Sequence, residues 1–200
     1  MPLSYRPGHA QVDFGETLGM IGGKECKIHF FVMSLPHSDG VFVEGYRAET
    51  TEAFCDAHVS AFAFFGGIPQ SILYDNTKIA VAQILGDTTR IRTRRFMELQ
   101  SHHLFDDKFG RPARGNDKGN VARMVGYTRR NFMVPAPRYD SFDDLNAHLE
   151  TKCMARQGET LRGHDKTIGE RLISDTDALM GLPVAEYEAC DHVSTRATSI

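Results

Sequence analysis

Three runs of β-branched and aromatic residues near the start of the chain constrain its fold most strongly. Short turns that contain glycine or proline separate these runs, which cover residues 11–14, 26–35 and 40–46. Consecutive strands joined by such turns form an antiparallel meander. Thr50 or Thr51 can cap a helix that ends near Phe65, and residues 69–74 have the composition of a strand that follows this crossover. The pattern therefore predicts an α+β to α/β domain built on one sheet.

The second half of the chain has mainly helical signals. Helices are predicted over residues 93–104, from 116 or 117 to 133, and over 141–156, with an amphipathic stretch at 168–179. Ser141 with Asp144 three residues later resembles a capping box, although Asp replaces the usual Glu or Gln. An irregular basic loop at residues 110–115 precedes the second of these helices, and the chain becomes polar after Gly158.

Length and composition bound the class of protein. Two hundred residues with 41% hydrophobic content can form one ordinary domain with its own core and some appended helix. No run of eighteen apolar residues occurs, and the first residues lack the apolar centre of a signal peptide, so the cytoplasm is the expected compartment. The four cysteines form no Cys-x-x-Cys pair. Cys55 and His58 lie three residues apart on an apolar helical stripe, where core packing is favoured over metal binding.

The charge of the chain is unevenly distributed. Between Arg90 and Arg138 there are 12 Lys and Arg against 4 Asp and Glu, a net charge of +8, within a chain whose net charge is −3. The remainder has 11 basic against 22 acidic residues, a net charge of −11. This asymmetry is typical of a surface that binds phosphates. Arginines that merely solvate the outer faces of two helices would give the same pattern, and charge alone does not separate the two interpretations.

Two aspartates stand at the ends of strand-like runs. Asp13 lies within residues 11–16 (QVDFGE), and Asp75 lies within residues 72–78 (ILYDNTK). A strand would deliver each carboxylate to the rim of a sheet, where a pair of carboxylates can hold a divalent metal. The alternative is that each aspartate makes a turn or caps a helix. Asn76 and Lys78 follow Asp75 and can orient a phosphate, although a solvated turn explains them equally well.

These motifs carry a resemblance to a known family. The run from residue 11 to residue 132 resembles the catalytic core of bacterial insertion-sequence transposases of the IstA type, in the retroviral-integrase-like group that uses an Asp, Asp, Glu triad. Further matching segments are residues 29–33 (HFFVM), 53–58 (AFCDAH), 64–69 (FFGGIP) and 126–132 (GYTRRNF). The resemblance implies a ribonuclease-H-like fold, in which a mixed five-stranded sheet is flanked by helices. A fifth strand is then expected near residues 79–84.

The resemblance also implies which residues form the site, and it shows that one expected acid is missing. Asp13 and Asp75 match the two aspartates of the triad, whereas the third acid, expected in residues 116–122 (NDKGNVA), is Ala122. Alanine offers no ligand. Asp117 lies five residues earlier, on a different helical face, and is better explained as a helix cap or a neighbour of the site. Glu16 lies just past the first strand and is not a triad member.

The resemblance implies a function, partners and a division of the chain. The expected activity is metal-dependent DNA cleavage and strand transfer with two Mg²⁺ or Mn²⁺ ions, weakened here by Ala122. The expected partners are element-end DNA, target DNA, further transposase subunits and an ATPase helper. The residues expected to contact DNA are Lys78, Arg111, Arg114, Lys118, Arg129 and Arg130. Residues 1–138 would be the integrase-type core, and residues 139–200 a helical extension and linker that stops before a β-rich domain.

A second interpretation of the same chain belongs to a different class of protein. A non-catalytic remnant of a transposase could still bind DNA or transposase subunits, and it could poison an active assembly by joining it. Ala122 is the residue that separates this interpretation from that of an enzyme.

Overall fold

The computed structural model describes residues 5–74, 81–85, 89–109 and 119–187. The strands are β1 (His9–Ile21), β2 (Lys24–Leu35), β3 (Gly40–Tyr46), β4 (Ser71–Tyr74), β5 (Val81–Leu85), β6 (Thr89–Arg92), β7 (Asp106–Phe109) and β8 (Arg138–Tyr139). The helices are α1 (Thr51–Phe65), α2 (Arg94–His103), α3 (Gly119–Asn131), α4 (Phe142–Arg156) and α5 (Ile168–Ala178). None of the described helices is both long and apolar enough to cross a membrane.

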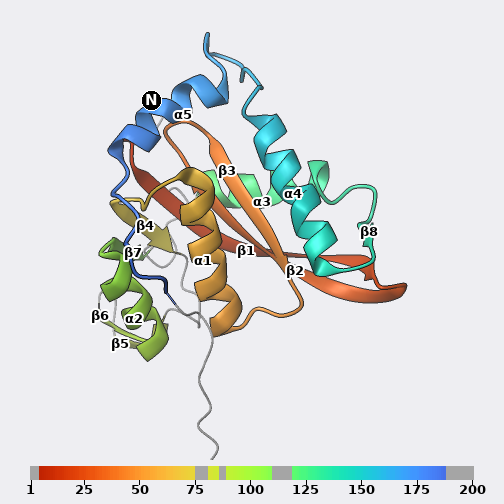
Figure 1. Ribbon diagram of the computed structural model, residues 1–200, viewed down its shortest axis with the longest axis horizontal. Coiled ribbons are helices and arrows are strands. Elements are labelled where there is room, and N and C mark those ends of the chain that lie inside the picture. Colours follow the sequence, from red (N-terminus) through yellow and green to blue (C-terminus); the bar gives the residue numbers. More distant parts are fainter. Residues whose placement is uncertain (1–4, 75–80, 86–88, 110–118, 188–200) are drawn as a thin grey trace, which may run out of the picture.

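The main sheet is mixed. Its strand order is β3-β2-β1-β4-β7, and β8 adds a short parallel pairing to the far end of β1. The first three strands form the predicted antiparallel meander, and β4 and β7 are parallel to β1. Figure 1 shows this sheet with α1 and α2 toward one side and α3 and α4 toward the other. The ribonuclease-H-like architecture predicted from the sequence is confirmed.

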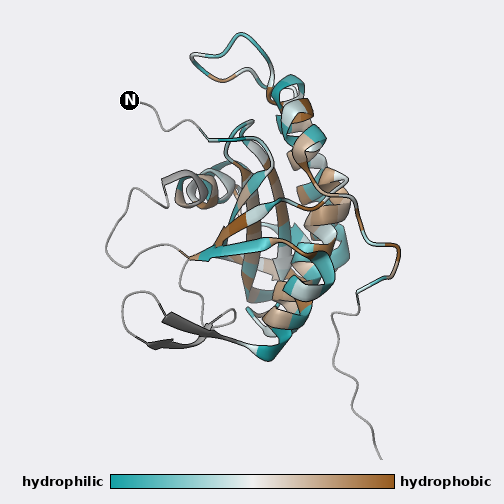
Figure 2. Ribbon diagram, turned by 90° about the vertical axis from the view of Figure 1, so that its left-hand side faces the viewer, coloured by the Kyte–Doolittle hydropathy of each residue, from teal (hydrophilic) through white to brown (hydrophobic). Residues whose placement is uncertain are grey.

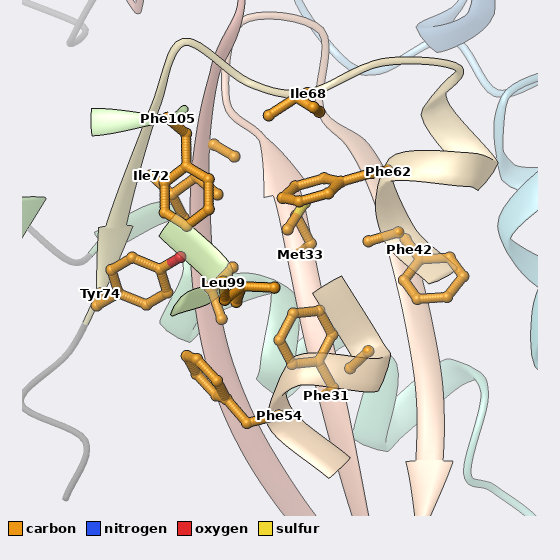
Figure 3. Packing of buried hydrophobic residues seen from close by; sticks show 14 of the residues in the cluster. Phe31, Met33, Phe42, Phe54, Phe62, Ile68, Ile72, Tyr74, Leu99 and Phe105 are labelled. Carbon is orange, nitrogen blue, oxygen red and sulfur yellow. The ribbon is translucent and has the colours of Figure 1, made fainter. Parts of the chain in front are cut away.

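The α1 face of the sheet carries an aromatic core. Phe31 and Met33 of β2 are fully buried there against α1, in a cluster that also holds Tyr74 of β4 (Figure 3). Phe96 of α2 belongs to the same cluster. Helix α1 begins where expected, because the hydroxyl of Thr50 accepts a hydrogen bond from the backbone N–H of Ala53 at 3.1 Å. It ends at Gly66, whose φ of 74° is a left-handed conformation that glycine adopts without strain.

The opposite face is covered by α3 and α4. Phe30 and Val32, which alternate along β2 with the residues of the aromatic core, point to this face. They pack with Met124 of α3 and Leu145 of α4. Figure 2 shows hydrophobic residues both on central strands and on the helices that pack against them. Helix α4 thus contributes to the core, and the domain boundary placed at residue 138 stays a prediction.

The prediction of a fifth main-sheet strand near residues 79–84 is wrong. Strand β5 overlaps that segment but pairs with β6 in a separate two-stranded sheet. The edge position is taken instead by β7, a four-residue strand of sequence DDKF that pairs in parallel with β4. Because three of these four residues are charged, the sequence lacks the apolar alternation that identifies a strand.

Candidate active site

Asp13 lies in the middle of β1, on the face of the sheet covered by α3. Its neighbours Val12 and Phe14 pack in or against the aromatic core on the α1 face, so position 13 points the other way. Its cross-strand partner Val32 belongs to the cluster on the α3 face. The side chain is partly buried, and its Oδ1 accepts a hydrogen bond from the backbone N–H of Phe14 at 2.9 Å. The carboxylate is therefore held close to its own strand.

Asp75 lies outside the described residues, but the strand that leads to it is well defined. The parallel ladder between β1 and β4 pairs Gln11 with Leu73 and Val12 with Tyr74. Asp13 follows Val12 along β1, and Asp75 follows Tyr74 in the sequence. Asn76 and Lys78 also lie outside the described part of the chain, as does Asp117.

Buried polar contacts anchor the end of β4. The hydroxyl of Tyr74 donates to Nε2 of His58 at 2.9 Å, and Nδ1 of His58 donates to the carbonyl of Phe54 at 2.7 Å. Burial lowers the pKa of His58 to about 3 and raises the pKa of Tyr74 well above its ordinary value. His58 is thus a neutral core histidine on α1, and the expected core position of Cys55 is also observed.

Helix α3 runs alongside β1 in the same direction. A Cβ atom on Gly15 would lie 2.9 Å from Cγ1 of Val125, so the helix approaches the strand closely at this glycine. Further along both elements, Nε of Arg129 donates to the carbonyl of Glu16 at 3.2 Å. This packing was not predicted from the sequence, because the predicted strand ended at residue 14. In the observed β1, Gly15 is a glycine inside a strand, which indicates a close approach of another backbone element.

From this alignment we infer the position of Ala122 relative to Asp13. Ala122 precedes Val125 by three residues, about 4.5 Å along a helix, on the same side of the helix. Asp13 precedes Gly15 by two residues, about 6.6 Å along a strand, on the same face of the sheet. Moving back from the contact between Gly15 and Val125 therefore leads to Asp13 on one element and to Ala122 on the other. Ala122 is exposed and carries no ligand atom.

The structure describes two of the six basic residues expected to contact DNA. Arg129 and Arg130 are both exposed in the last turn of α3, and within the described part of the chain Arg130 has no carboxylate partner. Lys78, Arg111, Arg114 and Lys118 lie outside the described residues. Glu16 is not part of a metal site here. It forms an exposed ion pair with Lys27 at 3.0 Å, and that ammonium group lowers the pKa of the Glu16 carboxyl.

The donor set for a metal is incomplete. Among the described residues there is no group of three or more His, Cys, Asp and Glu side chains that could hold an ion. Asp13 is the one carboxylate of the expected triad among the described residues. Ala122 stands at the position where the third acid of the triad is expected. Of the expected metal ligands, the described residues thus supply Asp13, and the role of Asp75 stays a prediction.

Comparison with known proteins gives sequence relatives along the whole chain. No protein-family model matches it. The transposase for insertion sequences IS1326/IS1353 of Pseudomonas aeruginosa is 35% identical over 201 residues, which cover 100% of this chain and 39% of that protein. A transposase of Aminobacter aminovorans is 35% identical over 90% of this chain and 36% of its own length. The transposase for insertion sequence element IS21 of Pseudomonas aeruginosa is 31% identical, and the match covers 89% of this chain and 46% of that protein.

The chain is related to insertion-sequence transposases. It spans less than half the length of these relatives, so their whole-protein activities are not carried over by the match alone.

Solved structures agree on the fold. The HTLV-2 integrase catalytic core domain in complex with magnesium superposes with a TM-score of 0.57 and 18% identity, over 84% of this chain and 98% of that one. A second match is a chain in the structure of the simian T-cell lymphotropic virus intasome in complex with PP2A regulatory subunit B56 gamma. It superposes with a TM-score of 0.60 and 16% identity, over 96% of this chain and 63% of that one. The transposase-related chain thus has the fold of an integrase catalytic core.

Proposed function

We propose that this chain is the catalytic-core region of a DNA transposase in which DNA cleavage and strand transfer are impaired. One observation carries the proposal. The described ladder between β1 and β4 ends with the pair Val12 and Tyr74, and in the sequence an aspartate follows each of these two residues. Side chains at equivalent positions of adjacent parallel strands share a face of the sheet. The relationship to transposases and the integrase-core fold support the same interpretation.

Asp13 and Asp75 would hold Mg²⁺ or Mn²⁺, because hard cations prefer carboxylate oxygens. When bound, divalent metal supplies charge stabilisation for the attacking and leaving oxygens of a phosphodiester. The pairing of β1 with β4 would set the spacing of the two carboxylates. The buried contact between Tyr74 and His58 would keep the end of β4 in place, next to Asp75.

Ala122 is the reason to propose impaired catalysis. The alignment of α3 with β1 supports position 122 as the third corner of the site, and a methyl group there cannot bind a cation. Two carboxylates would hold one ion weakly and leave a second ion without its anionic ligand.

The basic residues would bind the DNA substrate. We assign phosphate contacts to Arg129 and Arg130 at the end of α3, to Lys78 after the Asp75 motif, and to Arg111, Arg114 and Lys118, which lie with the two α3 arginines in the basic segment from Arg90 to Arg138. The partners would be element-end DNA, target DNA, further transposase subunits and an ATPase helper, all in the cytoplasm where the DNA lies.

A second candidate function is that of a non-catalytic remnant. Ala122 specifically favours it, because the fold and the exposed arginines of α3 do not depend on that side chain. Such a protein would bind DNA or transposase subunits without cleaving DNA, and it would lower the activity of an intact transposase with which it assembled.

The experiment is a cleavage assay on DNA fragments that carry the ends of the insertion sequence around this coding region, with Mg²⁺ or Mn²⁺. We expect binding with little or no cleavage by the natural chain and detectable cleavage by Ala122→Glu. Binding without cleavage by both proteins would support the remnant. Efficient cleavage by the natural chain would overturn the assignment of position 122 as the missing ligand.

A further inference from the structure

Asp39 connects two helices that are far apart in the sequence. It lies in the turn between β2 and β3 with a φ of 64°, a left-handed conformation that is uncommon for residues other than glycine. Its Oδ2 accepts hydrogen bonds from both terminal nitrogens of Arg171 on α5, at 3.2 and 3.3 Å. Its Oδ1 accepts a hydrogen bond from Arg123 on α3. Each carboxylate oxygen thus serves one guanidinium group.

A second carboxylate fixes α5 to the same turn. Asp175 lies four residues after Arg171, on the same side of the helix, and is completely buried. Its Oδ2 accepts from the backbone N–H of Ser38 at 3.1 Å, and its Oδ1 accepts from the backbone N–H of Gly8 at 2.9 Å. Figure 1 shows α5 beside the turn between β2 and β3, at the end of the sheet. The turn therefore cannot move independently of α5.

The exposure of the three charged groups shows how the link is built. The side chains of Asp39 and Arg171 are 10% and 11% exposed, whereas that of Arg123 is 57% exposed. An exposed ion pair alone contributes little to stability. Here the carboxylate that Arg123 meets is already oriented by Arg171, so Arg123 binds a preformed acceptor. Hydrogen bonds between a guanidinium group and a carboxylate are charge-assisted and are among the stronger hydrogen bonds in proteins.

Arg123 directly follows Ala122 in α3. Because consecutive helical residues move together, the contact with Asp39 restrains position 122 as well as its own residue. Val125 restrains the same turns from the other side, against Gly15. The first described turns of α3 are thus held by the sheet on one side and by α5, through Asp39, on the other.

We propose that Arg123, Asp39 and Arg171 are positioning residues, through which α5 sets the place of position 122 relative to Asp13. This inference rests on the proposed function, since it gives position 122 its role as the third corner of the site. It makes α5 part of the machinery that shapes the site, although α5 contributes no ligand to it.

The first test measures amide hydrogen exchange in the otherwise natural chain. We expect Arg123→Gln to speed exchange of residues 122–126 several-fold while exchange in α4 stays unchanged. Arg171→Gln should have the same effect on α3, and the double variant should add little, because both substitutions break one link. The matched control is Arg162→Gln, which removes an exposed arginine from the segment between α4 and α5. Exchange in α3 that does not respond to either substitution would overturn the proposal.

The second test measures Mn²⁺ affinity in the Ala122→Glu background. Arg123→Gln and Arg171→Gln should each lower the affinity several-fold, and Arg123→Lys should restore part of it. If Ala122→Glu binds Mn²⁺ and neither substitution changes the affinity or the exchange, the positioning role is wrong. If the exchange changes as expected but Ala122→Glu never binds Mn²⁺, the link stands and the metal site fails. If Arg171→Gln does not fold, both measurements are made on Arg123→Gln, which changes an exposed side chain.

Discussion

The hydroxyl of Tyr74 donates a hydrogen bond to Nε2 of His58, 2.9 Å away in the aromatic core between α1 and β4. Tyr74 is the last residue of β4 and the partner of Val12 in the parallel ladder. Asp75 follows it directly. The polar contact therefore joins the core of the domain to the strand end from which the proposed site extends.

Removal of the Tyr74 hydroxyl is expected to destabilise the domain. Tyr74→Phe leaves Nε2 of His58 buried without a donor, which costs on the order of 1–3 kcal/mol of unfolding free energy. Urea denaturation followed by circular dichroism measures this loss. The control is Tyr139→Phe, since the hydroxyl of Tyr139 has no hydrogen-bond partner among the described residues. Equal stabilities for both variants would contradict the role of the contact.

The buried His58 predicts acid sensitivity. Its pKa is lowered from 6.5 to about 3 by burial, so the unfolded chain binds an extra proton at this residue between those two pH values. The contribution of the neutral His58 to the unfolding free energy is fully present above about pH 6.5, and it is lost progressively as the pH falls toward 3. The loss should reach roughly 3 kcal/mol at pH 4.

Unfolding free energies of the natural chain and His58→Gln between pH 7 and pH 4 test this prediction. Other groups also titrate in that range, so the quantity that matters is the difference between the two curves. We expect His58→Gln to be less stable at pH 7 but to lose less stability on acidification. Parallel curves for His58→Gln would contradict a neutral buried imidazole.

Gly15 is expected to tolerate no side chain. A Cβ atom there would lie 2.3 Å from the ring of Phe30 and 2.9 Å from Val125, so the ring or α3 would have to shift. We expect Gly15→Ala to cost about 1–3 kcal/mol, as overpacking of a core does. Thermal unfolding checks it against Gly181→Ala, where no atom lies within 4 Å of the added group. Similar stabilities of the two variants would show that α3 adapts without cost.

The sequence predicted the elements whose signals are local. Strand β3 and helix α1 have the predicted bounds, because alternating apolar residues, the cap at Thr50 and the glycine at position 66 act within a few residues. Strand β1 runs to Ile21, well past the predicted end at residue 14, because its later residues gain their pairing from β2. These residues pair with β2 across the short turn at Gly22 and Gly23, but Gly15, Glu16 and Gly19 interrupt the apolar alternation by which a strand is recognised.

The same reasoning applies to the site. The two aspartate motifs and the position of Ala122 were accessible from the sequence, since resemblance and spacing carry them. The link from Arg123 through Asp39 to Arg171 could not be predicted, because the two arginines lie 84 and 132 residues from Asp39 in the sequence. Asp39 also sits in a segment that reads from sequence as an ordinary turn.

The exposed arginines at the end of α3 predict salt-dependent binding to DNA of any sequence. Each phosphate contact contributes roughly −0.9 to the slope of log affinity against log salt for duplex DNA. Arg129→Glu with Arg130→Glu should therefore weaken binding and flatten the slope by about 2. The control Arg162→Glu with Lys166→Glu makes the same change in net charge at two other exposed residues. Fluorescence anisotropy across a salt series measures both pairs. Unchanged affinity and slope would assign the arginines to a solvated helix face.

Substitution of Ala122 by glutamate is the prediction that separates an impaired enzyme from a remnant. A carboxylate at position 122 would extend toward Asp13 from the helix that Gly15 and Val125 bring against β1. Mn²⁺ affinity, measured by calorimetry, should rise. Ala122→Gln is the matched control, because it adds similar volume without a charge. Cleavage of element-end DNA should also rise. A loss of 4 kcal/mol of transition-state stabilisation, taken as an illustration, corresponds to about a thousandfold in rate, so even partial recovery is measurable.

The outcomes of that substitution are distinct. If Ala122→Glu binds Mn²⁺ more tightly than Ala122→Gln and cuts DNA, the site is intact apart from its third ligand. If it binds metal and cuts nothing, a further defect lies elsewhere and the catalytic assignment fails for this chain. If the two variants bind Mn²⁺ equally weakly, position 122 does not face Asp13 closely enough to share an ion, and the alignment of α3 with β1 does not build a metal site.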